Sequence, residues 1–189
     1  MNTQIDDIAF KSFPVLESDR LQFRDFVSSD AEDLFFIRSN DQIMEYMDTD
    51  KHSTILESDS LILQIAQSFK NKTGISWAIV EKSSNIVIGY FGFWRIMREH
   101  CRAEIGFALK PDFWGKGYMT ETLNTLIEFG FNSLKLHSIE ANVNPANENS
   151  KQLLEKNGFK QEAHFRENYF FNGKFIDSII YSILEPNLI

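Results

Sequence analysis

The pattern of apolar and polar positions predicts seven β-strands. In "DRLQFRDF", Leu21 and Phe23 alternate with polar neighbours, which is typical of a half-buried strand. β-Branched and aromatic residues separated by short polar turns then predict a meander of antiparallel hairpins, made of "SWAIVEK", "IVIGYFGFWRI" and "CRAEIGFALK". "HSIEANVN" predicts a fifth strand. "EAHFRENYFF" and "KFIDSIIYSIL" predict a final hairpin, whose turn type is set by Asn172-Gly173.

Two helices are predicted between the first strand and the meander. "SSDAEDLFFIRS" begins with Ser29 or Asp30 as a cap and carries acids in its first turn. "STILESDSLILQIAQSF" has a capping signal between Ser53 and Glu57, followed by apolar residues on one side. The link between these helices, "NDQIMEYMDTDKH", is predicted to be irregular and is a candidate lining of a substrate cleft.

Two more helices are predicted after the meander. The clearer one follows a glycine turn, because apolar residues recur there at spacings of three and four, namely Met119, Leu123, Leu126, Ile127, Phe131 and Leu134. The other, in "ANENSKQLLEKNGF", ends at Asn157 and Gly158. A left-handed Gly158 would bring Leu154 against Phe159, the usual closing contact of such a helix end.

The order of these elements indicates an α+β fold. One strand is followed by two helices, three strands, a helix, a strand, a helix and two strands. "AEIGFAL" leads into the glycine turn and its helix, and "SIEANVN" returns afterwards. Such a strand-helix-strand crossover predicts that these two strands are parallel neighbours with a right-handed connection.

Length and composition fit one globular domain over residues 1–189, with 43% hydrophobic and 14% aromatic residues for its core. No apolar run approaches the roughly 20 residues of a membrane helix, so we expect a soluble protein with no membrane partner. The N-terminal stretch carries acids and lacks the pattern of a secretory signal, so a cytoplasmic location is expected.

The net charge, the single cysteine and the four histidines limit the kinds of ligand and reaction that are expected. The formal net charge of -8 argues against nucleic acid as a partner and mildly favours a cationic one. The single cysteine, Cys101, permits no internal disulfide, and no Cys-His pair with a third orienting group marks it as a nucleophile. The four histidines show no metal-ligand spacing, so no metal is expected.

"PDFWGKGYMTETL" places two glycines around Lys116, directly before a helix. Glycines let the backbone approach a ligand, and a helix start offers unpaired N–H groups with a positive dipole end, so this turn predicts a phosphate site. A Walker loop would need Ser or Thr after Gly-Lys, and Gly117 stands there instead. A dinucleotide-binding fold would place its glycines near the first strand.

These stretches together resemble the GNAT superfamily of acetyl-CoA-dependent N-acetyltransferases over nearly the whole chain. The resemblance is strongest to the branch that acetylates the N-termini of ribosomal proteins. It rests on "RLQFRDF", "IGYFGFWRI", "AEIGFALKPDFWGKGYMTETL", "ANVNPANENSKQLLEKNGF" and the last hairpin, in the family's order. It implies a mixed, mostly antiparallel sheet of about seven strands with four flanking helices and one parallel pair that splays apart.

The resemblance also implies where acetyl-CoA binds. Backbone amides of the turn would bind the coenzyme's pyrophosphate, and they belong to Trp114, Gly115, Lys116, Gly117, Tyr118, Met119 and Thr120. The family prefers Gln or Arg where Trp114 stands and Gly or Ala where Met119 stands. Lys116 is either a charge partner for a phosphate or an exposed turn lysine. Backbone groups along the pantetheine arm and thioester would come from Phe107, Ala108 and Leu109, and Asn142 is a further coenzyme candidate.

Two residues of "NPANENS" resemble functional groups of this branch. Asn147 would bind the coenzyme's arm, or it caps the helix, and both roles are compatible. Ser150 would donate a proton to the leaving thiolate, or it is a solvent-facing helix serine.

A general base for the incoming amine is predicted less directly. Glu104 lies in an apolar strand between small neighbours, and burial would raise its pKa toward a useful range. Alternatively it is an edge or partly exposed glutamate paired with Arg95, Arg98 or Arg102. In the last hairpin, Glu167 and Tyr169 are further candidates, and a water-relayed base would also serve.

The sequence therefore predicts direct transfer of acetyl from acetyl-CoA to a primary amine, either a protein N-terminus or a small amine. The competing prediction is a non-catalytic module that senses acetyl-CoA or docks a partner. The chain is expected to be a monomer or a homodimer, since the last hairpin exposes a β edge.

Overall fold

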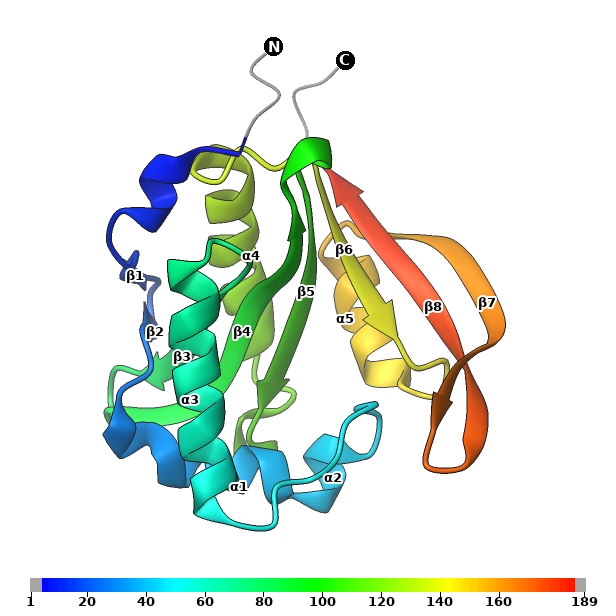
Figure 1. Ribbon diagram of the computed structural model, residues 1–189, viewed down its shortest axis with the longest axis horizontal. Coiled ribbons are helices and arrows are strands. Elements are labelled where there is room, and N and C mark those ends of the chain that lie inside the picture. Colours follow the sequence, from blue (N-terminus) through cyan, green and yellow to red (C-terminus); the bar gives the residue numbers. More distant parts are fainter. Residues whose placement is uncertain (1–4, 186–189) are drawn as a thin grey trace.

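The computed structural model describes residues 5–185, and its core is one eight-stranded sheet with the order β1-β2-β3-β4-β5-β6-β8-β7 (Figure 1). All neighbouring strands are antiparallel except β5 and β6, which run parallel as predicted. The strands are β1 (Leu16–Glu17), β2 (Leu21–Arg24), β3 (Ile75–Glu81), β4 (Ile86–Met97), β5 (Arg102–Leu109), β6 (Ser138–Val143), β7 (Lys160–Phe171) and β8 (Lys174–Leu184). The first four residues of the N-terminal stretch lie outside the described range.

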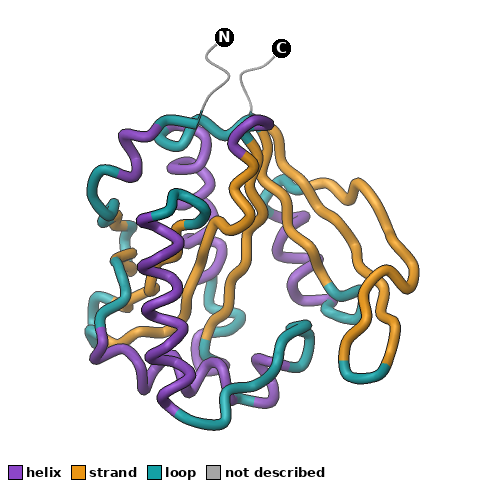
Figure 2. Tube along the Cα trace, viewed as in Figure 1, coloured by secondary structure: helices purple, strands orange, loops and turns teal. Residues whose placement is uncertain are grey.

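Helices lie on both faces of the sheet (Figures 1 and 2). The α-helices of the described chain are α1 (Ala31–Ser39), α2 (Asp41–Met44), α3 (Ile55–Lys70), α4 (Tyr118–Asn132) and α5 (Glu148–Lys156). On one face, α1 and α3 pack on apolar side chains of β3 and β4. On the other face, α4 and α5 join the larger core through residues such as Leu123, Leu126 and Leu154. The predicted α+β class is therefore confirmed.

One short strand and one short α-helix were not predicted. β1 has only two residues, a length at which no periodicity is visible, and it adds an eighth strand. The stretch predicted to be an irregular link contains α2, and in this respect the prediction was wrong. Asn40 begins α2 because its side chain accepts hydrogen bonds from the N–H groups of Gln42 and Ile43, at 3.0 and 3.1 Å.

Local end signals give α3, α5 and the last hairpin their boundaries. Helix α3 begins one residue later than predicted, with Thr54 at the cap, and the carboxylate of Glu57 accepts the Thr54 N–H at 2.8 Å. Gly158 has φ +87° at the end of α5, and the Phe159 N–H donates to the Leu154 carbonyl at 3.1 Å. In the hairpin, Asn172-Gly173 has φ +47° and +77°, the left-handed pair of a type I′ turn.

The parallel pair β5–β6 closes only at one end. The paired positions are Arg102 with Ser138, Ala103 with Ile139, and Glu104 with Glu140. Beyond Glu104 the two strands diverge, as Figure 1 shows, while β5 stays paired with β4 as far as Leu109. The splayed pair implied by the family resemblance is therefore present.

Close packing between β4 and β5 gives a test of the fold. A Cβ atom added at Gly89 would lie 2.2 Å from the Ala108 carbonyl oxygen and 2.5 Å from Leu109 Cδ2. We expect Gly89→Ala to lower the free energy of unfolding by about 1–3 kcal/mol, because β5 must shift to admit the methyl group.

The matched control is Gly106→Ala on β5, where the nearest atom to an added Cβ is 3.7 Å away. It should change the unfolding free energy by about 0.5 kcal/mol or less. Urea unfolding followed by circular dichroism measures both variants, and equal losses would contradict this account of the β4–β5 packing.

Candidate acetyl-CoA site

The glycine turn presents a row of unpaired backbone amides. Gly115 and Gly117 have φ +69° and +80°, which glycine adopts without strain, and α4 begins at Tyr118. The first N–H of this helix to find a helical partner is that of Glu121, which donates to the Gly117 carbonyl at 3.0 Å. Within residues 5–185, no acceptor lies in hydrogen-bond geometry with the N–H groups of Gly115, Lys116, Gly117, Tyr118, Met119 and Thr120. Six adjacent donors at a helix N-terminus form a site suited to an anion.

The amide of Trp114 is the exception in the predicted set. It donates to the Pro111 carbonyl at 3.0 Å, so it is already used within the turn that leads out of β5. The indole N–H of Trp114 donates to the Leu109 carbonyl at 2.8 Å and ties the glycine turn to the end of β5. Trp114 therefore has a positioning contact here, and its amide is not free for a ligand.

Arg20, the residue directly before β2, holds the turn from outside. Its Nη1 donates to the Lys116 carbonyl at 3.0 Å, its Nε lies 2.7 Å from a Glu121 oxygen, and its guanidinium lies 4.0 Å from the centre of the Tyr118 ring. Ser18 also donates to Glu121, at 2.6 Å. Because the Lys116 carbonyl is held toward Arg20, the turn keeps its N–H groups available, with the Arg20–Glu121 ion pair beside them.

The carboxylate of Glu121 stays charged in this arrangement. Burial raises the pKa of Glu121, but hydrogen bonds from Ser18 and Arg20 outweigh it and hold the pKa below its ordinary value. Tyr118 is held in turn by its hydroxyl, which donates to Glu81 at 2.5 Å. Sequence reasoning missed Arg20, since it is 101 residues from its carboxylate partner and no local pattern joins them.

The divergence of β5 from β6 exposes backbone groups along one edge of β5. The Lys110 N–H donates across to β4 at 2.8 Å, whereas the Leu109 carbonyl points away from β4 to Trp114. Because successive strand residues direct their backbone groups to opposite edges, Ala108 faces β4, and Phe107 and Leu109 face the opening. Of the three residues predicted to contact the coenzyme's arm, Phe107 and Leu109 therefore present backbone groups there.

Helix α5 begins beside the far strand of the opening. Asn147 is its cap, and its side-chain oxygen accepts the Ser150 N–H at 3.0 Å. The capping alternative for Asn147 is thus confirmed, and it fixes the first turn in which Ser150 lies half-buried. Asn142 lies exposed on β6, beyond the last position paired with β5.

Glu104 lies where β5 and β6 begin to part. It is buried, and its Oε2 is 3.2 Å from Arg95 Nη1, so the predicted burial and the predicted ion pair are both present. Burial raises the pKa of Glu104 above its ordinary value, and the neighbouring charges of Arg95 and Arg102 oppose this rise. Its neighbour on β6, Glu140, pairs with Arg102.

The other candidate bases lie elsewhere. Glu167 and Tyr169 are exposed on β7, which the sheet order separates from β5 by β6 and β8. Glu167 has φ +49° in a bulge, and its N–H donates to Asp177 at 2.9 Å. The Tyr169 hydroxyl donates to the Asp48 carbonyl at 3.1 Å, which joins the last hairpin to the loop after α2. The structure therefore places Glu104, and not these two residues, at the strand opening.

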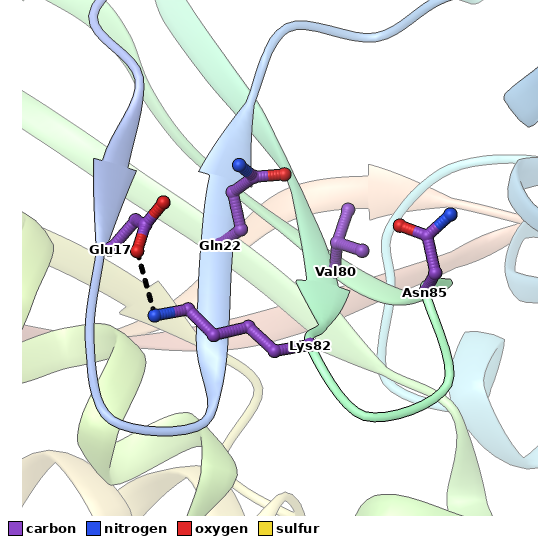
Figure 3. A pocket seen from close by; sticks show the side chains of 5 residues that line it. All are labelled: Glu17, Gln22, Val80, Lys82 and Asn85. Atoms are coloured by element: carbon purple, nitrogen blue, oxygen red, sulfur yellow. Dashed lines mark hydrogen bonds and ion pairs between the residues drawn. The ribbon is translucent and has the colours of Figure 1, made fainter.

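A surface pocket on β1–β3 has a different character (Figure 3). It is lined by Glu17, Gln22, Val80, Lys82 and Asn85. Val80 belongs to the core under α1 and α3, so this pocket lies on the face of the sheet that does not carry α4. Lys82 and Glu17 neutralise each other at 2.8 Å. We assign it no ligand.

Two further properties concern the described part of the chain alone. Residues 5–185 contain no group of three or more His, Cys, Asp or Glu side chains arranged to hold a metal ion. No helix in the same range is long and apolar enough to cross a membrane.

Comparison with known proteins places this geometry in a family. The profile described as "Acetyltransferase (GNAT) domain" matches residues 20–160. The uncharacterized N-acetyltransferase YoaA of Bacillus subtilis is 36% identical over 92% of this chain and 98% of its own length. The crystal structure of ribosomal-protein-S5-alanine acetyltransferase from Vibrio fischeri superposes with a TM-score of 0.81, at 26% identity over 92% and 98% of the two chains. Spermidine N(1)-acetyltransferase of Vibrio cholerae is 31% identical over 52% of this chain and 57% of its own.

In this protein, the open parallel strand pair and the turn of free amides thus belong to a fold of acetyl-transferring enzymes. The protein belongs to the GNAT acetyltransferase family, as the sequence resemblance predicted. It is an acetyl-CoA-dependent N-acetyltransferase. Of the two predicted functions, the prediction of an enzyme is therefore confirmed.

The arginine beside the turn gives a test of the anion site. If the turn amides bind the coenzyme's pyrophosphate, Arg20→Ala should raise the Kd for acetyl-CoA about tenfold, because the turn loses a charge-assisted hydrogen bond and its nearby cation. Isothermal titration calorimetry measures this directly.

The control is Arg98→Ala, which removes another partly exposed arginine with a carboxylate partner, Asp7, away from the turn. Its Kd should match that of the unchanged protein. Equal affinities for all three proteins would show that Arg20 does not support coenzyme binding at the turn.

Proposed function

We propose that the protein transfers the acetyl group directly to a cationic primary amine, which approaches Glu104 on the face of the sheet that carries α1 and α3. The buried carboxylate at the strand opening is the observation that carries this proposal, because it lies where β5 turns its backbone toward the coenzyme's expected path. A carboxylate with a raised pKa suits an amine acceptor, which must lose a proton before it attacks.

For the coenzyme, the free amides from Gly115 to Thr120 would hold the pyrophosphate, with Lys116 as a charge partner. Phe107 and Leu109 would pair through their backbone with the pantetheine arm, in the manner of an added strand. Asn142 and Asn147 would contact the same arm from β6 and α5. This assignment is supported by the unpaired state of the amides and by the divergence of the strands.

The chemistry then has three steps. The acceptor ammonium gives a proton to the Glu104 carboxylate, directly or through a water molecule, and becomes a neutral amine. Its nitrogen attacks the thioester carbonyl, and backbone N–H groups of the opening support the oxyanion. The C–S bond breaks as the nitrogen loses its second proton and the amide forms. Ser150 donates a proton to the departing sulfur and regains one from that nitrogen through water. Positioning in one ternary complex supplies much of the barrier reduction.

The acceptor face of the site carries three carboxylates, two of which are paired with arginines. Glu140 on β6 lies on the same face of the sheet as Glu104 on β5. On the adjoining strands β7 and β8, the Glu162 carboxylate accepts a hydrogen bond from the Ser182 hydroxyl at 2.7 Å. The Tyr169–Asp48 contact joins the last hairpin to the α2 loop as a further wall. The net charge of -8 acts in the same direction. Known relatives act on a ribosomal-protein alanine or on spermidine, and both acceptors carry a positively charged amine.

The direct test is calorimetric titration with acetyl-CoA, followed by thiol release with a panel of amines. The panel contains an alanine-starting peptide, spermidine, an amino sugar and n-butanol as a neutral control. Release with a cationic amine and not with the alcohol supports the proposal. Binding of acetyl-CoA with no release on any amine would contradict it.

The proton donor is tested by Ser150→Ala. We expect turnover to fall about tenfold, a modest effect because a thiol with a pKa of about 8.5 leaves without much help. The Kd for acetyl-CoA should stay within about twofold, and Ser60→Ala on the exposed side of α3 should change neither value. Equal losses in turnover and affinity would show that Ser150 binds the coenzyme instead.

The base is tested by Glu104→Gln over a range of pH. The active form of Glu104 is deprotonated and its pKa is raised, so activity should increase as pH rises through a value above that of an ordinary glutamate. The amide variant should lose about 100-fold or more in kcat at pH 7, together with that acid limb. A pH-rate profile that is the same in both proteins would exclude Glu104.

A further inference from the structure

We propose that Arg95 is a specificity-determining residue whose guanidinium occupies the binding place of the acceptor's positive charge, between the ring of Trp94 and the carboxylate of Glu104. This inference rests on the proposed function of Glu104. The acceptor ammonium must displace Arg95 to reach that carboxylate, so the enzyme carries an internal competitor for its own substrate.

A bulge in β4 aims Arg95 at this place. Trp94 pairs with Glu104 and Met97 with Arg102, so two residues of β4, Arg95 and Ile96, lie opposite one residue of β5. Arg95 has φ +47°, a left-handed conformation that is costly for a residue with a Cβ atom. A regular strand would alternate faces and direct Arg95 to the same side as the fully buried Phe93. The bulge instead turns the Arg95 side chain to the face of the sheet on which Trp94 and Glu104 lie.

The contacts that Arg95 makes there are those of a bound organic cation. Its guanidinium carbon lies 4.3 Å from the centre of the Trp94 ring, and its Nη1 lies 3.2 Å from Glu104 Oε2. The Trp94 ring also lies against Gly106, with its Nε1 3.7 Å from the position that a Cβ atom would take there. An aromatic face next to a carboxylate is an arrangement that binds ammonium groups.

The two side chains of the Arg95–Glu104 ion pair differ in exposure, and this difference favours the exchange of Arg95 for another cation. The Glu104 side chain is 7% exposed, whereas that of Arg95 is 62% exposed. Moving the guanidinium into water costs little, because exposed charged groups gain little from pairing. The carboxylate cannot follow, since it is held in the sheet. An incoming ammonium would therefore exchange with Arg95 at constant net charge.

The neighbouring arginines Arg98 and Arg102 are paired with other carboxylates, so Arg95 is the partner of Glu104. Arg102, on the same strand as Glu104, is paired with Glu140. In residues 5–185 the only ion pair of Glu104 is the one with Arg95. Other cations of this region, such as Arg98, are paired elsewhere. Removing Arg95 therefore leaves a buried carboxylate with an empty cation place beside Trp94.

The test uses Arg95→Gly, because glycine suits the left-handed backbone and removes the whole side chain. The probes are n-butylamine as acceptor and methylguanidinium as a substitute for the lost side chain. We expect the KM for n-butylamine to fall about fivefold or more, with a smaller change in kcat. The acid limb of the pH-rate profile should move to higher pH, because Arg95 lowers the pKa of Glu104.

Methylguanidinium should bind the Arg95→Gly protein and inhibit it competitively against n-butylamine, with a change in tryptophan fluorescence that disappears when Trp94 is also replaced by Phe. The unchanged protein and the Arg98→Ala control should show at least a fivefold weaker effect. A KM that is equal or higher in Arg95→Gly, without methylguanidinium binding, would overturn the proposal.

The fluorescence titration separates two kinds of failure. If the unchanged protein releases no thiol with any amine, the proposed function fails, and methylguanidinium binding to Arg95→Gly still decides whether the cation place exists. If the unchanged protein is active and Arg95→Gly behaves like Arg98→Ala in both assays, the proposal for Arg95 alone fails.

Discussion

Backbone hydrogen bonding between β5 and β6 stops after Glu104 and Glu140, and the rest of the site depends on this limit. An unpaired backbone amide inside a sheet costs folding free energy unless another group accepts its hydrogen bond. Here β4 satisfies one edge of β5 as far as Leu109, and the other edge stays open beyond Glu104. An extended ligand with alternating carbonyl and amide groups, such as the pantetheine arm of coenzyme A, would complete that edge. The backbone of the fold would thus offer a binding place before any side chain takes part.

The same constraint sets the position of the anion site. The chain leaves β5 at Lys110, turns over two glycines and enters α4, so the free amides of the turn lie directly beyond the open edge. The indole of Trp114 ties this turn to Leu109, and Arg20 ties it to β2. A coenzyme bound along β5 would therefore meet the helix N-terminus at its pyrophosphate. On the other side of the opening, Glu104 lies at the point where the strands separate, which is where the thioester is expected.

Sequence alone predicted the parts of this arrangement that are encoded locally. Gly158 and Asn172-Gly173 set a helix end and a hairpin turn through their own backbone preferences. The amphipathic repeat of α4 and its preceding glycines required only neighbouring residues. The parallel pair followed from the order of elements and the handedness of crossovers.

What sequence did not predict arises from contacts between distant segments or from local strain. Arg20 finds Glu121 across 101 residues, and Tyr169 finds the loop at Asp48 across 121. The bulge at Arg95 places a charged residue on the face opposite to the one its alternation indicates. Ala108 was grouped with its neighbours although the strand directs its backbone to β4. These features need the three-dimensional pairing of strands, which a single sequence does not contain.

The most direct test of the central claim is amide hydrogen exchange, measured residue by residue by NMR with and without acetyl-CoA. The account predicts fast exchange at Phe107, Leu109 and Gly115 to Thr120 in the free protein, and strong protection of these amides when acetyl-CoA is bound. Slow exchange in the free protein, or bound acetyl-CoA that leaves these amides unprotected, would contradict it.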